Sequence, residues 1–177
     1  DDYFRTAGEF AAIAAENGLS LGVVVLWCNY VEGTWGAART PGSVMPDEAR
    51  VRFVDRVVEV FAPHHPLFIV SGDERFDGEA SRQVYGQTLR QVKRAAPDCL
   101  TTLHSTPDTE LPAVLADDDA LDLYSYQAGH HEDRQDLAWR LAEQYLDQRR
   151  RRPVMDLEPC YEGHGFGGGL GRYRAAE

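Results

Sequence analysis

The chain has 177 residues, of which 43% are hydrophobic and 27% are charged, a composition typical of a soluble globular domain with a substantial core. Its formal net charge of −11 argues against nucleic acid and an anionic membrane as partners, because both require a basic face. No apolar run approaches the roughly 20 residues that span a bilayer. The three cysteines have neither the spacing of a metal site nor the even number of a disulfide framework.

The first half of the chain alternates helical and strand patterns. Residues 3–17 carry apolar side chains at helical spacing, and Gly18 follows as a C-terminal cap. Residues 19–27 form a nearly continuous apolar run, which predicts a strand buried on both faces. After a polar, glycine-bearing loop at 28–46, the pattern predicts a helix at 47–61 and a strand at 67–70.

The second half repeats this cycle. It predicts a helix at 79–96, strands at 100–104 and 121–126 separated by a short helix at 111–116, a long helix at 133–150 and a last strand at 154–157. The last turn of the long helix would carry the arginines 149–152, where positive charge is favourable against the helix dipole. A glycine-rich segment follows at 160–171.

Strict alternation of buried strands with helices predicts βαβ units and a parallel sheet. Two α/β architectures fit this pattern, a doubly wound open sheet and a (β/α)8 barrel. A whole barrel takes about 250 residues, so this chain would hold part of one. The leading helix and the glycine-rich end favour the partial barrel. The Gly-Phe-Gly-Gly-Gly segment at 165–169 lacks the Lys and Ser/Thr of a phosphate-binding loop.

Each predicted strand ends in polar or aromatic residues, which is where α/β folds place their chemistry. Asp73 ends the segment Phe68-Ile-Val-Ser-Gly-Asp73, and Glu158 ends Pro153-Val-Met-Asp-Leu-Glu158. Two carboxylates on different strands are the minimal equipment for hydrolysing a glycosidic bond. Aromatic rings can stack on a sugar and polar groups can bind its hydroxyls, so the candidate substrate-binding residues are Trp27, His104, Gln127, His130, Tyr161 and Glu162.

Simpler roles compete for several of these residues. Asp73 could cap the helix that follows it, and Trp27 could be an ordinary core residue. Glu158 precedes a proline and no helix, so capping explains it poorly. The adjacent His130 and His131 would point in opposite directions on an extended chain, which disfavours a metal pair. We expect neither a metal nor another cofactor.

Several segments together resemble the apiosidase-like glycoside hydrolases. The segment from Pro153 to Gly163 is similar to that family's Pro-Val-x-x-x-Glu-Pro-x-Tyr-Glu motif, and Gly72-Asp73 resembles its Gly-Gly-Asp, with Ser71 in place of the first glycine. Thr102-Leu-His104, Tyr126-Gln-Ala-Gly-His130 and Leu26-Trp27 resemble further family motifs in the same order along the chain.

The resemblance implies a retaining (β/α)8-barrel hydrolase in which this chain supplies strands three to seven as a single partial catalytic domain over residues 1–177. It implies Asp73 as the acid/base, Glu158 as the nucleophile, and plant or microbial polysaccharide side chains as the carbohydrate substrate. Further chain segments or subunits would then cover the open barrel edges. Two other functions stay open: a non-catalytic carbohydrate-binding module, and a metal-dependent hydrolase using His104, His130 and Asp73.

Overall fold

The computed structural model describes residues 2–130, 134 and 136–161. Its strands are β1 (Gly22–Trp27), β2 (Leu67–Gly72), β3 (Leu100–Thr102), β4 (Tyr124–Gln127) and β5 (Val154–Glu158). Its α-helices are α1 (Asp2–Glu16), α2 (Trp35–Arg39), α3 (Asp47–Phe61), α4 (Glu79–Ala95), α5 (Ala113–Ala116) and α6 (Leu137–Leu146). Within this described part, none of the helices combines the length and apolarity needed to traverse a lipid bilayer.

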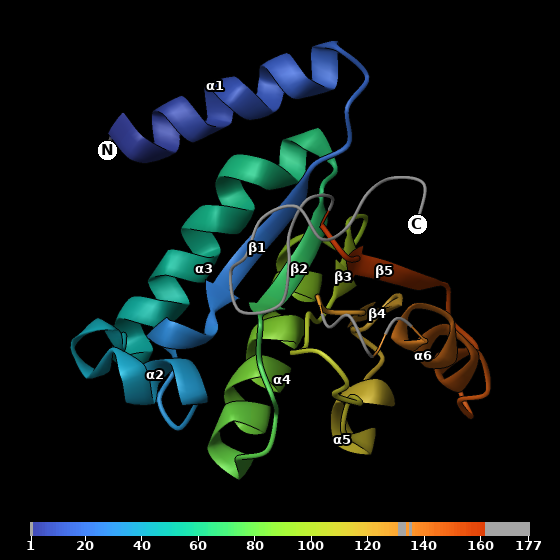
Figure 1. Ribbon diagram of the computed structural model, residues 1–177. Coiled ribbons are helices and arrows are strands. Elements are labelled where there is room, and N and C mark those ends of the chain that lie inside the picture. The colour runs from blue at the N-terminus through green and yellow to red at the C-terminus, as the bar shows by residue number, and fades with distance from the viewer. Residues whose placement is uncertain (1, 131–133, 135, 162–177) are drawn as a thin grey trace.

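The strands lie side by side in the order in which they occur along the chain (Figure 1). β1, β2 and β3 form one parallel sheet, and β4 and β5 pair in parallel in a second. Side chains join the two sheets: Thr102 Oγ1 donates to the carbonyl of Leu123 at 3.0 Å, and Ser125 Oγ donates to that of Leu103 at 2.7 Å. This sequential order confirms the barrel-type prediction and excludes the reversed order of a doubly wound sheet.

The core lies between the strands and the helices that cover their outer side (Figure 1). α3 and α4 pack against each other, α4 contacts β2 and β3, and α6 contacts β4 and β5. The alternating strand residues that face these helices are fully or nearly fully buried, and apolar residues of α3, α4 and α6 meet them. This layer includes Val25, Val54, Val58, Phe68, Val70, Leu89, Val92, Leu137 and Leu141.

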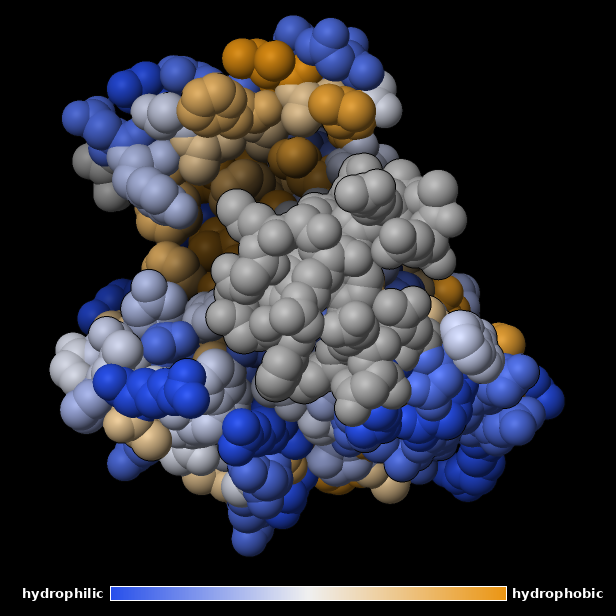
Figure 2. Space-filling model, in the orientation of Figure 1, coloured by the Kyte–Doolittle hydropathy of each residue, from blue (hydrophilic) through white to orange (hydrophobic). Residues whose placement is uncertain are grey.

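The prediction that the first strand is buried on both faces is wrong for the described residues. Val25 packs into the helix-facing core, but its neighbour Val24, which points to the other face, is 42% exposed. Met155 of β5 is 46% exposed in the same way. These apolar side chains lie on the inner side of the curved sheet, which no described helix covers. Further apolar surface lies on α1 and in the recess beneath it (Figure 2).

The long helix is shorter than predicted. α6 ends at Leu146, so the four arginines do not form its last turn. Arg149 and Arg150 instead form ion pairs with Asp117 and Asp119 of the loop between α5 and β4. The acidic residues 117–119 therefore belong to an ion-paired loop.

Arg152 ties this loop to the start of β5. Its guanidinium donates to the carbonyls of Leu121 and Ala116 at 2.6 Å and of Asp118 at 2.7 Å. The same group lies over the ring of Tyr124, 5.4 Å from the ring centroid. A planar fork of donors can satisfy three carbonyls that point in different directions, whereas an ammonium group cannot do so from the same position.

We therefore expect Arg152→Lys to lower the free energy of unfolding by about 2–4 kcal/mol, because an ammonium group cannot make all three of these hydrogen bonds. Urea unfolding of the purified protein measures this change. Arg149→Lys is the matched control, since the Arg149 side chain is 83% exposed and its ion pair is a surface contact. Equal stability of the two variants would contradict a structural role for the Arg152 guanidinium.

Candidate active site

Trp27, the last residue of β1, packs against Gly72, which ends β2 and precedes Asp73. A Cβ added to Gly72 would lie 2.3 Å from Cε3 of the Trp27 ring, so only glycine lets the indole rest on the β2 backbone here. Trp27 is nevertheless 40% exposed, and it is therefore not an ordinary core residue. It presents a partly exposed aromatic surface beside Gly72, the residue before Asp73.

Ser71 and His104 fix the ends of β2 and β3 against each other. Ser71 Oγ donates to the carbonyl of His104 at 3.0 Å and accepts from its backbone N–H at 2.9 Å. The serine that departs from the family's glycine thus supplies a buried link between the two strands. The backbone N–H of Asp73 donates to His104 Nδ1 at 3.3 Å. In neutral His104 the proton is consequently on Nε2.

Four groups surround the carboxylate of Glu158. Tyr161 Oη donates to Oε1 at 2.6 Å, and His130 Nε2 lies 3.2 Å from the same oxygen. Since His130 Nδ1 accepts the backbone N–H of Tyr161 at 3.4 Å, the proton on Nε2 faces Glu158. His104 Nε2 lies 3.4 Å from Oε2. Gln127 is the residue directly opposite Glu158 in the β4–β5 pairing, after a register shift.

These contacts favour an ionised Glu158. Burial alone would raise its pKa, but the hydrogen bonds of Tyr161 and His130, the His104 ring and the Gln127 amide together hold the pKa below its usual value. Conversely, the hydrogen bond to Glu158 raises the pKa of Tyr161 to about 12, so the phenol stays protonated and keeps donating. Burial lowers the pKa of His104, against the attraction of Glu158 and Asp73, which favours its neutral form.

The pKa of Asp73 is shifted in the opposite direction. Burial raises its pKa and the negative charge of Glu158 adds to the effect, while His104 and Arg75 oppose it. Two carboxyl groups whose pKa values are pushed apart in one site can serve as an acid and a base at the same pH. The His104 imidazole links the Asp73 backbone to the Glu158 carboxylate, accepting from the Asp73 N–H on one side and facing Glu158 on the other.

The structure thus brings seven of the eight residues singled out in the sequence to the carboxyl ends of the strands. They are Trp27, Asp73, His104, Gln127, His130, Glu158 and Tyr161. Glu162 lies outside the described residues.

Two further residues of this region were missed by the sequence reasoning. The indole Nε1–H of Trp35 donates to the carbonyl of Asp73 at 2.7 Å. Glu74 is fully buried and accepts the backbone N–H of Phe76 at 3.1 Å, which stabilises the turn after Asp73. The sequence carried one signal for the first of them, because Thr34 is a typical N-cap and marks a short helix that begins at Trp35.

The described side chains are poorly arranged for the metal site that a metal-dependent hydrolase needs. Within the described part of the chain, no three His, Cys, Asp or Glu side chains are arranged to hold a metal ion. Nδ1 of His104 and Nδ1 of His130 each accept a backbone N–H, and their Nε2 atoms face Glu158. In the proposed trio of His104, His130 and Asp73, the two histidines therefore face Glu158.

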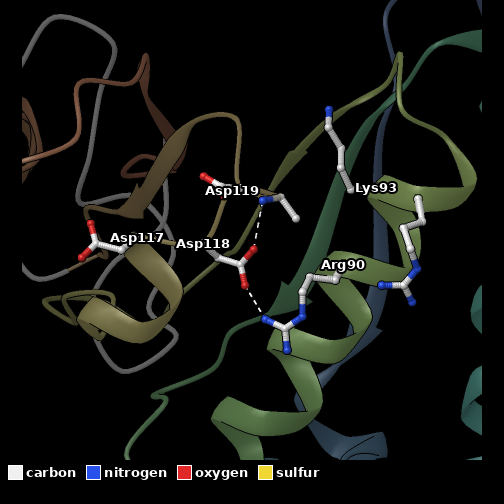
Figure 3. A pocket seen from close by; sticks show the side chains of 7 residues that line it. Arg90, Lys93, Asp117, Asp118 and Asp119 are labelled. Atoms are coloured by element: carbon white, nitrogen blue, oxygen red, sulfur yellow. Dashed lines mark hydrogen bonds and ion pairs between the residues drawn. The ribbon is translucent and has the colours of Figure 1, made fainter.

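A cavity of about 550 Å³ lies at the opposite end of the strands (Figure 3). It is lined by Arg90, Lys93 and Arg94 of α4 and by residues 117–120, which precede β4. Asp118 pairs with Arg90 and also accepts the backbone N–H of Ala120, as the dashed lines in Figure 3 show. Lys93 pairs with Asp122, and Asp117 and Asp119 pair with Arg149 and Arg150, so these charges serve to hold the loop in place.

A parallel sheet in barrel order, with carboxylates at the carboxyl ends of its strands, defines the (β/α)8-barrel type of glycoside hydrolase. The model of the family described as "Apiosidase-like, catalytic domain" matches residues 1–175, and the chain therefore belongs to the apiosidase-like family. The sequence resemblance is thereby confirmed. A comparison with curated proteins found no match.

Two solved structures share the fold. One is a glycoside hydrolase family 5 protein from Bacteroides vulgatus ATCC 8482, with a TM-score of 0.70 and 22% identity over 87% of this chain. The other is described as a glycoside hydrolase, with a TM-score of 0.71 and 21% identity over 89% of this chain. The matched region covers 33% and 36% of those two chains, so this chain spans about a third of their length.

Proposed function

We propose that this chain is a single catalytic domain of a retaining glycoside hydrolase that acts on side chains of plant or microbial polysaccharides. Asp73 is the acid/base and Glu158 is the nucleophile. The observation that carries this assignment is the contrast between the two carboxyl groups at the strand ends: Tyr161 and His130 contact Glu158 at 2.6 and 3.2 Å and lower its pKa, while burial raises the pKa of Asp73.

In the first step, an oxygen of Glu158 attacks the anomeric carbon as the bond to the glycosidic oxygen breaks. Asp73 gives its proton to that oxygen, so the leaving group departs as an alcohol and Asp73 becomes a carboxylate. In the second step, Asp73 takes a proton from water, and the resulting nucleophile attacks the same carbon and releases Glu158. Two displacements restore the original configuration of the sugar.

The surrounding residues support a sugar-binding role. The exposed face of Trp27 can stack on a sugar ring. Gln127, His130 and Tyr161 surround Glu158, the proposed nucleophile. The exposed inner side chains Val24 and Met155 support the proposal that further chain segments or subunits complete the inner side of the barrel. Experiments on activity therefore require the full-length protein.

The stereochemistry of turnover tests the mechanism. We expect proton NMR of an aryl glycoside hydrolysis to show a first-formed product that retains the substrate's anomeric configuration. A 2-deoxy-2-fluoro glycoside with a good leaving group should label the peptide that contains Glu158, because the fluorine slows release of the covalent intermediate. An inverted product would make Glu158 a general base instead. Sugar binding without any turnover would favour the non-catalytic carbohydrate-binding module.

A further inference from the structure

The backbone of Asp73 has an unusual conformation. Its φ angle is +54°, in the left-handed region that a residue with a Cβ adopts only at a cost in free energy. Such a conformation persists when neighbouring groups hold the peptide in place. Two side chains do so here from opposite directions: His104 Nδ1 accepts the N–H of Asp73 at 3.3 Å, and Trp35 Nε1–H donates to its carbonyl at 2.7 Å.

Trp35 is itself held by the segment after β1. Thr34 caps the short helix α2, since its Oγ1 accepts the backbone N–H of Ala37 at 3.1 Å. The same hydroxyl can donate to the carbonyl of Val31 at 2.8 Å. A Cβ on Gly36 would lie 2.5 Å from the sulfur of Cys28, so α2 is seated directly on the end of β1. The indole thus extends from a firmly packed turn.

The loop that carries Asp73 also contacts the indole through a second group. The guanidinium of Arg75, two residues further along the chain, lies over the Trp35 ring at 5.5 Å from the centroid. The guanidinium of Arg39 lies over the same ring at 5.0 Å. A cation over an aromatic face is attracted by its π electrons, and these contacts therefore restrict the orientation of the ring. A fixed ring keeps its N–H directed at the Asp73 carbonyl.

We infer that Trp35 is a positioning residue for Asp73: its indole N–H fixes the Asp73 peptide so that the carboxyl group stays directed at the glycosidic oxygen. This inference rests on the proposed function, because it needs Asp73 to be the acid/base. Proton transfer to a leaving group depends steeply on orientation, and a displacement of about 1 Å can cost 10²-fold in rate. The loss of rate on removing the indole N–H should be confined to substrates whose leaving group needs the proton from Asp73.

The test compares Trp35→Phe with Trp139→Phe in the full-length protein. Trp139 lies on α6 and is 60% exposed, so it offers a matched change outside the site. We expect Trp35→Phe to lower kcat/KM, which reports the first step, by about 10- to 100-fold on an unactivated alkyl glycoside and by less than about threefold on a 4-nitrophenyl glycoside. Trp139→Phe should leave both rates unchanged.

A second variant separates the hydrogen bond from the shape of the ring. Replacing the indole of Trp35 by a benzothiophene keeps the bicyclic ring and its contacts with the arginines but removes the N–H. It should reproduce the selective loss. An equal loss of kcat/KM on both substrates, or no loss, would overturn the inference, because a merely structural role does not depend on the leaving group.

Asp73→Asn, measured with the same two substrates, distinguishes failure of the positioning role from failure of the proposed function. Selective loss in Asp73→Asn without selective loss in the Trp35 variants overturns the positioning role alone. If Asp73→Asn shows no dependence on the leaving group, the proposed function fails, and the positioning role fails with it.

Discussion

Glu158→Gln is expected to lower kcat by roughly 10⁴- to 10⁶-fold on every glycoside, whether its leaving group is good or poor. The amide can still accept the hydrogen bonds of Tyr161 and His130, so the site should keep its shape. It cannot form a glycosyl ester, and the covalent pathway is therefore lost. Initial rates of full-length protein on 4-nitrophenyl and alkyl glycosides measure the effect.

The matched control is Glu143→Gln, a residue of α6 outside the site. Glu158→Gly with added azide gives an independent check, since azide can enter the space of the missing carboxylate and attack the anomeric carbon of an activated substrate. A single displacement should yield a glycosyl azide of inverted configuration. Undiminished turnover by Glu158→Gln would show that another group forms the intermediate.

Asp73→Asn is expected to lower kcat on poor leaving groups by about 10²- to 10⁴-fold and to affect 4-nitrophenyl glycosides far less in their first step. An activated phenolate leaves without a proton, whereas an alkoxide does not. Asparagine is a suitable replacement because it tolerates the left-handed backbone that Asp73 adopts, while alanine at this position would add strain. Rates on a series of aryl glycosides measure the dependence on the leaving group.

The pH profile provides a second measurement on the same variant. The first step requires ionised Glu158 and protonated Asp73, so the rate should fall as pH drops through the lowered pKa of Glu158 and fall again as pH rises through the raised pKa of Asp73. The alkaline decline should disappear in Asp73→Asn with an activated substrate. Azide should also speed turnover by Asp73→Ala and give a product of retained configuration. Equal loss on all leaving groups would remove Asp73 from the acid/base role.

Local sequence patterns predicted most of the helices and strands, because each kind of element has its own spacing of apolar residues. The helix at 47–61 matches α3 residue for residue, and the predicted helix at 79–96 differs from α4 by one residue. The first strand begins later than predicted, at Gly22, because the left-handed Gly18 ends α1 with a turn and Leu19 remains exposed. The positive charge of arginines 149–152 is typical of the C-terminal end of a helix. Arg149, Arg150 and Arg152 instead contact groups of residues 116–121, which lie 31 to 36 positions away in sequence.

The parallel α/β class, the barrel order of the strands and the positions of Asp73 and Glu158 at two strand ends could all be predicted from the sequence. These follow from hydrophobic period and from motifs, which are local properties of a chain. The opposite pKa shifts of the two carboxyl groups could not be predicted in this way, because the donors around Glu158 and the burial of Asp73 come from different strands. The contact of Trp35 with Asp73 joins residues 38 positions apart, and no local pattern specifies a pairing across that separation.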